Sequence, residues 1–534
     1  MQPVGKPPHK VFFWWKEQYG VILIPCFRNR RVKCDETRPE CLRCTGTNRK
    51  CDGYEEDSSP PTSLVISPSA KLCPLDRDPH HDEVSMFGIF RDDFLSRLTG
   101  GIFTKVWSHD ILQAAQTYPA VWHAGLAMAA AQKRSKIQGN EGNALESKTK
   151  YYSFSLLHYN ASIKYLMEIV SRKDLSDGDR ETLLVTSVLF LSLCALQNNT
   201  KDALVHAQSG TNLYYQWDMC DSEIEASRKG VLSIESLNIL ITTLECTYTG
   251  SVMHSIIPKK WDWTSRPLPN CSAIPFESLS AAYTEFIPLL SLIVEQGRNV
   301  GSESFFYSAR DCCLSVWNHY QHEYGLWRGK FREFLMSWEP NDEELEGVLQ
   351  LKMLVRVFDL VFGDISHPVE MHWDTCGPAF EEIVDIGEQM WELQNRTAEK
   401  YDEEAGAFTL LLFPAEGLYF VVANCRDADL RTRSIELLKK WKRQNGVWDS
   451  GTMATLCETL VLYEEEGASE DEWCKCIPGE FICYGHRSAW TKSVIGQEGE
   501  VVMTIRSVAD MKNDLPGITY MLQSQQKLRL DNLN

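Results

Sequence analysis

The chain has 534 residues, of which 43% are hydrophobic and 11% aromatic, enough apolar material to bury a large core. No apolar run reaches the roughly 18 residues that a membrane-spanning helix needs. The best candidate, residues 408–425, is interrupted by Pro414 and Glu416. A signal peptide is not expected, because Lys16 and Glu17 break the apolar stretch near the start. We therefore expect a soluble intracellular protein with no membrane partner, whose 18 cysteines are reduced thiols or metal ligands.

Charge divides the chain into two unequal parts. Residues 1–54 contain 11 Lys and Arg against 5 Asp and Glu and carry +6, whereas the remainder carries −25, for a net charge of −19. A short basic segment attracts a polyanion, and a long acidic body repels it. This asymmetry indicates a small nucleic-acid-binding segment attached to a body that does not bind nucleic acid.

Residues 1–27 have an irregular composition. They crowd the aromatic cluster Phe12–Trp15 and an apolar run ahead of Cys26. This stretch resembles neither a basic arm nor a metal-binding loop. The aromatic cluster could anchor the chain to a membrane or a partner, but unstructured or non-native sequence is the favoured interpretation. Residues 11–27 are of the kind that a translated intron or a wrong exon start produces.

Residues 28–54 form a basic module with regularly spaced cysteines. Its cysteines follow the pattern Cys-x6-Cys-x2-Cys-x6-Cys and are Cys34, Cys41, Cys44 and Cys51. Two thiolates separated by two residues can grip one Zn²⁺ ion, which prefers four tetrahedral sulfur or nitrogen ligands. The basic residues before this pattern suit phosphate groups and guanine edges, and they are Arg28, Arg30, Arg31 and Lys33. The module therefore predicts zinc as a cofactor and double-stranded DNA as a partner.

This module resembles the fungal zinc binuclear-cluster transcription factors, in which six cysteines hold two zinc ions. By that resemblance the four cysteines are the third to sixth of the family pattern, and Pro39 is its loop proline. The resemblance also implies that Arg31 reads a base in CGG-type triplets. It further implies that the neighbouring basic residues contact phosphates, namely Arg28, Arg30 and Lys33.

The resemblance stops upstream of Arg28. The first two cysteines of the family would fall where Ile24 and Phe27 stand, and Cys26 lies nearby but out of register. An intact cluster would hold two zinc ions. The ligands present here would hold at most one, weakly, with Cys26 as a makeshift fourth ligand. The sharp edge of the match predicts that the native transcript encodes cysteines in place of Ile24 and Phe27.

Residues 55–82 contain five prolines among Ser and Asp residues and are predicted to be a disordered linker. From residue 83 to 486, apolar residues recur at helical spacing. Ser176-x-x-Asp179 is a capping box ahead of one apolar run, and Thr200 and Asp429 are predicted to cap two further helices. Helices joined by short loops indicate a large all-α domain, so the expected fold class is mainly α.

The helical region resembles the regulatory domain that many of these transcription factors carry. The matching features are, in chain order, Trp107–Met128, Tyr159-Asn160-x-x-Ile163, His206–Gly210, Cys425-Arg-Asp and Ile435–Ser450. The resemblance implies regulation and transactivation, through contacts between the acidic helical domain and the transcription machinery. It does not imply catalysis.

Several further residues could bind metal. Near the end of the helical region, Cys474, Cys476, Cys483 and His486 have a spacing compatible with a second metal site. No other ligand-like residue stands nearby, so the sequence favours a reduced, loop-rich patch instead. His123 and His206 lie in apolar helices and are interpreted as core histidines with satisfied hydrogen bonds.

The C-terminal segment, residues 487–534, departs from the helical pattern. Ala489–Ile495 and Val501–Ile505 flank Gly496-Gln-Glu-Gly499, which predicts a short β-hairpin. The five predicted parts are therefore 1–27, 28–54, 55–82, 83–486 and 487–534.

No dinucleotide-binding, P-loop, metalloprotease or nucleophile-elbow motif is found in the sequence. We expect a nuclear, DNA-binding regulator of RNA polymerase II genes and not an enzyme. The alternative is a regulatory or scaffold protein that keeps the helical domain with a degenerate zinc cluster and does not bind DNA.

Overall fold

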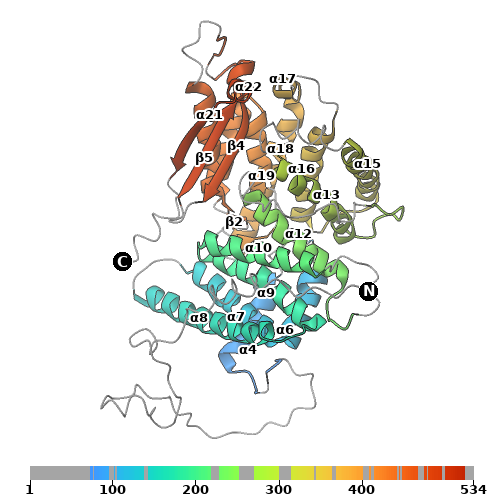
Figure 1. The fold of residues 1–534 in the computed structure, drawn as a ribbon, viewed down its shortest axis with the longest axis vertical. Coiled ribbons are helices and arrows are strands. Elements are labelled where there is room, and N and C mark those ends of the chain that lie inside the picture. The colour runs from blue at the N-terminus through green and yellow to red at the C-terminus, as the bar shows by residue number, and fades with distance from the viewer. Residues whose placement is uncertain are drawn as a thin grey trace.

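The computed structural model describes residues 73–522 with internal gaps. The gaps are 76, 96–101, 103–104, 138–141, 218–227, 252–269, 300–313, 342–343, 364–368, 401–407, 411–413, 442–443, 446–447, 467–473, 478 and 496–499. Within the described part, helices dominate and strands are short, so the prediction of a mainly α fold is confirmed (Figure 1).

The first group of helices forms one tier of the molecule, drawn in blue to green in Figure 1. It consists of α4 (His81–Ile89), η1 (Phe90–Phe94), η2 (Val106–Asp110), α6 (Ile111–Thr117), α7 (Pro119–Ser135), α8 (Gly142–Val170), α9 (Asp177–Leu196) and α10 (Thr200–Gln216). Helix α7 is its centre and packs against α4, α6, α8 and α9. Its alanine-rich stretch Ala127-Met-Ala-Ala-Ala131 is buried, because small side chains let neighbouring helices approach closely.

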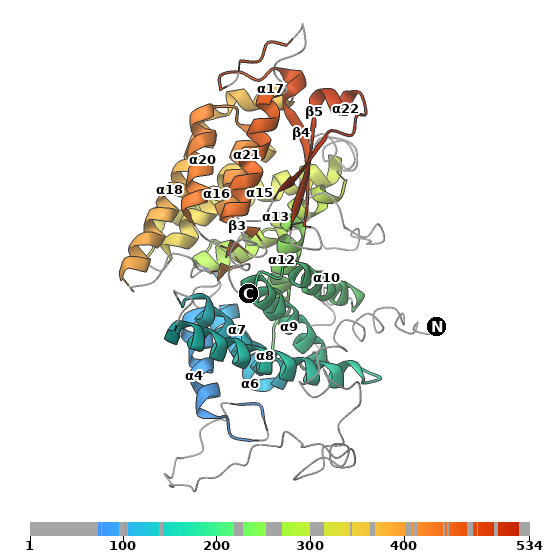
Figure 2. The same ribbon diagram turned by 90° about the vertical axis from the view of Figure 1, so that its left-hand side faces the viewer.

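The second group continues the stack of helices. It consists of α12 (Ile234–Ser251), α13 (Leu279–Asn299), α15 (Leu314–Ser337), α16 (Leu345–Phe362), α17 (Val369–His372), η4 (Trp373–Thr375), α18 (Gly377–Lys400), α19 (Pro414–Asn424), α20 (Ala428–Trp441) and α21 (Ser450–Glu466). Helix α12 packs against α10 and α13 and so joins the two tiers (Figure 2). Further along, α18, α19, α20 and α21 pack on one another. One continuous hydrophobic core runs through both groups.

The capping box at Ser176 is confirmed, since Asp179 N donates to Ser176 Oγ and Ser176 N donates to Asp179 Oδ2. The two other predicted caps are wrong by one or two residues. Asn199 caps α10 in place of Thr200, because its Oδ1 accepts from Asp202 N. Asp427 occupies the capping position of α20, where its Oδ1 accepts from Leu430 N at 3.0 Å, and the predicted cap Asp429 lies inside the helix.

The end of the predicted linker is ordered. Cys73 and Leu75 are buried in the hydrophobic core. Arg77 forms a two-pronged ion pair with Glu83, whose carboxylate also accepts from His80 N at the start of α4. The described residues between Cys73 and Asp82 are therefore ordered, because apolar side chains and an ion pair anchor this stretch on α4.

Two small sheets accompany the helices. The first joins β1 (Phe408–Thr409), β2 (Gln444–Asn445) and β3 (Trp448–Asp449). The second is antiparallel and joins β4 (Ser488–Ile495), β5 (Val501–Ser507) and β6 (Ile518–Leu522) in that order. The predicted hairpin is confirmed as β4 and β5. Strand β6 was not predicted, because it is an edge strand that leaves Ile518 and Met521 exposed.

The second sheet lies against the last helices. Strand β5 alternates buried and half-buried residues, with Val501, Met503 and Ile505 facing the core. Helix α22 (Val508–Lys512) follows it directly, and α21 packs against β4 and β5. Figure 1 shows this sheet at the edge of the upper tier. Of the helices described, none is both long and apolar enough to cross a membrane.

Candidate metal centre

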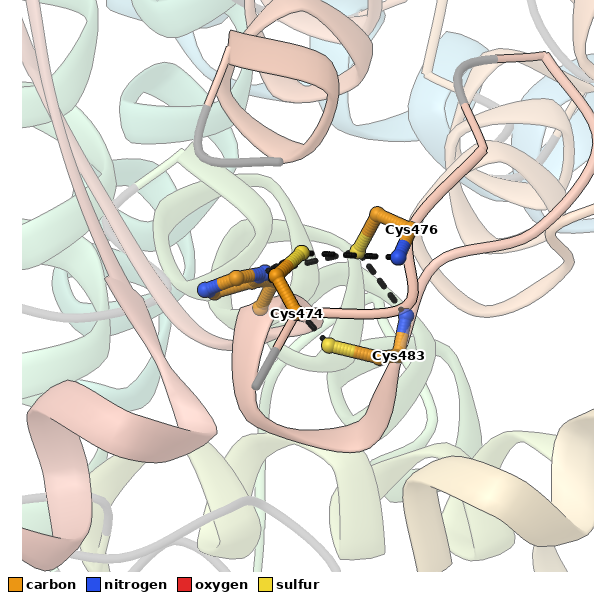
Figure 3. A group of neighbouring side chains, drawn as sticks. Cys474, Cys476 and Cys483 are labelled. Atoms are coloured by element: carbon orange, nitrogen blue, oxygen red, sulfur yellow. Dashed lines mark hydrogen bonds between the residues drawn. The ribbon is translucent and has the colours of Figure 1, made fainter. Parts of the chain in front are cut away.

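The loop between α21 and β4 brings four potential metal ligands together. They are Cys474, Cys476, Cys483 and His486, and one ligand atom from each lies within 4.8 Å of the others. Figure 3 shows the three cysteine side chains converging from this one loop. The sequence favoured a reduced, loop-rich patch over a second metal site, whereas the structure brings all four side chains together.

The loop folds this way because of a tight turn between the second and third cysteines. The backbones of Ile477 and Phe481 pair in both directions, with N···O distances of 2.7 and 2.8 Å. Gly479 has a φ of +77° at the tip, which a residue with a Cβ adopts only under strain. The pairing places Cys476 and Cys483 side by side. A short 3-10 turn, η5 (Tyr484–His486), then returns the imidazole to the sulfurs.

The distances within the group are nearly equal. The Sγ atoms of Cys474, Cys476 and Cys483 lie 3.3, 3.3 and 3.4 Å from Nδ1 of His486. Two sulfurs also accept backbone N–H groups, from Cys476 to Cys474 Sγ at 3.4 Å and from Cys483 to Cys476 Sγ at 3.1 Å. All four residues are half-buried. Such a group can hold a tetrahedral cation with no position left over.

The thiols of the turn influence one another. Burial raises the pKa of Cys476 to about 12; the backbone N–H of Cys483 acts against burial, and the thiols of Cys483 and Cys474 add to it. Burial also acts on Cys483, but hydrogen bonds from Cys476 and from backbone N–H groups outweigh it and hold the pKa of Cys483 below its ordinary value. The first thiolate to form therefore disfavours a second, since like charges repel at this distance.

Directly after His486, the chain enters a buried ionic network. Arg487 is 1% exposed and donates to both carboxylate oxygens of Asp374, at 2.8 and 2.7 Å, and to the carbonyl of Ile482. It also donates to the carbonyl oxygen of Glu370 in α17. The loop of the four ligands is thereby fixed to α17 and η4.

Glu464, at the end of α21, is the centre of the same network. Its side chain has no exposed surface and accepts from Arg426 at 2.8 Å and from Arg431 at 2.6 Å. It also accepts the backbone N–H and the hydroxyl of Ser488, the first residue of β4, at 2.7 and 2.8 Å. Burial raises the pKa of Glu464, but the two arginines outweigh burial and hold it at about 2. The network therefore joins β4 to α20 and α21.

A second group of potential ligands, Glu83, His123 and His158, lies buried between α4, α7 and α8. The two Nδ1 atoms are 2.8 Å apart, which is a hydrogen-bond distance. Two nitrogens on one tetrahedral zinc ion would stand about 3.3 Å apart. Glu83 is already occupied by Arg77. Burial lowers the pKa of both histidines to about 4, so His123 and His158 form a neutral hydrogen-bonded pair in the core.

The interpretation of His123 and His206 as core histidines is confirmed. His206 is buried edge-on against the Phe190 ring, and burial lowers its pKa to about 3. The predicted DNA and zinc residues of the N-terminal module lie outside the described residues. These are Cys26, Arg28, Arg30, Arg31, Lys33, Cys34, Cys41, Cys44 and Cys51.

Comparison with known proteins places the N-terminal module in a family. The fungal Zn(2)-Cys(6) binuclear cluster domain matches residues 25–61, which include Cys26 and the four regularly spaced cysteines. The transcriptional regulatory protein moc3 of Schizosaccharomyces pombe is 46% identical over 56 residues, 9% of this chain and 11% of its own length. No solved structure matches the chain.

Similarity to other regulators extends through the helical region. The aspercryptin biosynthesis cluster-specific transcription regulator atnN of Emericella nidulans is 21% identical over 561 residues, covering 88% of this chain and 90% of its own. The transcription regulator lscL of Purpureocillium lilacinum is 26% identical over 210 residues, covering 36% of this chain and 49% of its own. The chain belongs to the fungal zinc-cluster transcription regulators, with a zinc-binding module near its N-terminus and a mainly helical body.

Proposed function

We propose that this protein is a nuclear regulator of RNA polymerase II genes that binds CGG-type DNA triplets in a sequence-specific manner and is not an enzyme. The observation that carries the proposal is the run of basic residues directly before Cys34, inside the segment that matches the binuclear cluster domain. Arginine presents two parallel donors to the O6 and N7 atoms of guanine, whereas lysine is suited to phosphate as a point charge.

Within this proposal each residue has a separate task. Cys34, Cys41, Cys44 and Cys51 hold zinc, with Cys26 as a substitute for an absent ligand. Arg31 reads the base. The flanking cations fix the module on the backbone, and these are Arg28, Arg30 and Lys33. The organisation into five parts, with the acidic helical region contacting the transcription machinery, belongs to the same proposal.

The number of zinc ions depends on the N-terminal segment. Two ions require cysteines where Ile24 and Phe27 stand, and the ligands present leave at most one ion, bound weakly. Because metal binding drives the folding of such small modules, DNA affinity should follow zinc content. Zinc stoichiometry and DNA binding are therefore measured on the same protein preparations.

The decisive experiment compares Arg31→Ala with Lys33→Ala in the full chain. Binding is measured on CGG-containing and scrambled duplexes at fixed salt. Arg31→Ala should lose roughly 1–3 kcal/mol on CGG sites and little on scrambled DNA, whereas Lys33→Ala should weaken binding to both alike. Equal losses on both duplexes for Arg31→Ala would contradict its role in reading a base.

One observation favours a second function. The absence of cysteine at Ile24 and Phe27 breaks the six-cysteine pattern, and a degenerate cluster would leave a regulatory or scaffold protein that does not bind DNA. In that case the unaltered chain would bind CGG and scrambled duplexes no more tightly than the Arg31→Ala and Lys33→Ala variants do.

A further inference from the structure

We infer that Cys474, Cys476, Cys483 and His486 form a structural zinc site in the C-terminal half of the chain, separate from the N-terminal cysteine module. The match to the binuclear cluster domain covers residues 25–61 and so does not include this segment. The inference rests on the geometry of described side chains and does not depend on DNA binding.

Three sulfurs surround one nitrogen in this group. A ring nitrogen of histidine makes one hydrogen bond, either as a donor or as an acceptor. Nδ1 of His486 nevertheless has three sulfurs at 3.3–3.4 Å. In a tetrahedral zinc site, with Zn–S of about 2.3 Å and Zn–N of about 2.05 Å, each sulfur would lie about 3.6 Å from the nitrogen. A shared cation accounts for this convergence, and hydrogen bonding alone does not.

The sulfurs act as hydrogen-bond acceptors in their backbone contacts. Backbone N–H groups donate to Cys474 Sγ and Cys476 Sγ, as expected for thiolates, which are better acceptors than thiols. Three thiolates this close together repel one another without a cation. A disulfide is a poor alternative, because Cys474 and Cys476 are separated by one residue and none of these three described cysteines forms a disulfide. Four protein ligands close the coordination shell, which fits a structural site and not a catalytic one.

Little apolar surface is buried in the described part of this loop. Ile477 and Phe481, at its turn, are 52% and 37% exposed, and Ile482 is the buried apolar side chain of the turn. The described part of the loop buries few apolar side chains and so gains little from the hydrophobic effect, and small loop-rich segments commonly depend on a metal ion for that reason. The zinc ion would fix His486, and with it the adjacent Arg487 and Ser488. Those two residues attach the C-terminal sheet to η4 and α21.

The test counts zinc in the full chain after the N-terminal ligands have been removed. In a background with Cys26, Cys34, Cys41, Cys44 and Cys51 changed to Ser, elemental analysis should find one zinc ion per chain. Adding Cys476→Ser and Cys483→Ser should abolish it. His486→Cys should keep it, because four thiolates also bind zinc, whereas a purely hydrogen-bonding histidine would not be replaced by cysteine.

The matched control is Cys376→Ser, which should leave the zinc content at one ion. Cys376 is also half-buried and lies 3.6 Å from His372 Nε2, but no further cysteine joins it among the described residues. Loading the protein with Co²⁺ instead of zinc tests the coordination geometry. The background protein should show the visible absorption of tetrahedral Co²⁺ with thiolate ligands, and the Cys476→Ser/Cys483→Ser protein should not.

A third reading works on the unaltered chain. Lys475 stands exposed between two of the ligands, so removing zinc with a strong chelator should accelerate tryptic cleavage after Lys475, and adding zinc back should reverse this. The inference is overturned if the background protein, purified with zinc present, contains no zinc and shows no cobalt absorption. It is equally overturned if zinc content is unchanged by Cys476→Ser/Cys483→Ser, or if intact mass shows a disulfide among these cysteines under reducing-buffer purification.

Discussion

Replacing Glu464 with glutamine should loosen the attachment of the C-terminal sheet. The substitution keeps the shape of the side chain but removes the charge that Arg426 and Arg431 share. These arginines are 4% and 6% exposed, so their charges cannot be hydrated in compensation. Removing one partner of a buried ion pair costs about 3–5 kcal/mol. At roughly 2.1 cal/mol/K per residue over a body on the order of 400 residues, this lowers Tm by about 4–6 °C.

The control for this substitution lies on the same helix. Glu458 in α21 pairs with Lys439, but both side chains are about half exposed, at 47% and 50%. An exposed pair contributes about 0–1 kcal/mol, so Glu458→Gln should change Tm by no more than about 1 °C. Thermal unfolding followed by fluorescence, with proteolysis of the C-terminal sheet as a second reading, compares the two variants. If Glu464→Gln behaves like Glu458→Gln, the network does not hold the sheet.

The pH dependence of the same variant follows from the charge. The pKa of Glu464 is lowered to about 2 from an ordinary value of 4.5. A carboxylate whose pKa is lowered by folding contributes its full stabilisation at pH values above its ordinary pKa. It loses this stabilisation as the pH falls from the ordinary pKa through the lowered pKa. The difference in Tm between the unaltered chain and Glu464→Gln should therefore be the same at pH 7 and pH 5.5. It should shrink only below about pH 4.

Two further predictions concern the first helical tier. Asn199→Ala should lower the free energy of unfolding by about 1 kcal/mol and Thr200→Ala by much less, because Asn199 is the residue that caps α10. A larger loss of stability in the Thr200 variant, measured by thermal unfolding, would contradict this. Burial lowers the pKa of His206 to about 3, so between about pH 6.5 and pH 4 this histidine is protonated in the unfolded chain but neutral in the folded chain, and Tm should fall as the pH drops through this range. His206→Leu should make that fall in Tm less steep. An unchanged slope would show that His206 is not protonated on unfolding.

The sequence predicted the helices well where the signal is local. The box at Ser176 depends on residues three apart, and both hydrogen bonds form as expected. The caps of α10 and α20 were misplaced because Asn, Thr and Asp stand close together there, and spacing alone does not tell which one keeps a non-helical backbone geometry. The linker was predicted to be too long, since proline content gives no sign that Cys73 and Leu75 find a place in the core. Strand β6 was not predicted because an exposed edge strand has no strong alternation of apolar and polar residues.

The two cysteine groups show why metal sites are recognised unequally from sequence. The N-terminal group has spacing, basic flanks and a loop proline in common with a known domain, so four of six ligands suffice for a match to residues 25–61. The group at 474–486 has no such companion signals, and its spacing of one, six and two intervening residues is compatible with a loop of unrelated thiols. What decides between these interpretations is the turn at Gly479. Its positive φ lets Ile477 and Phe481 pair and turns Cys476 toward Cys483, so the clue available in the sequence was the Pro-Gly pair between these cysteines.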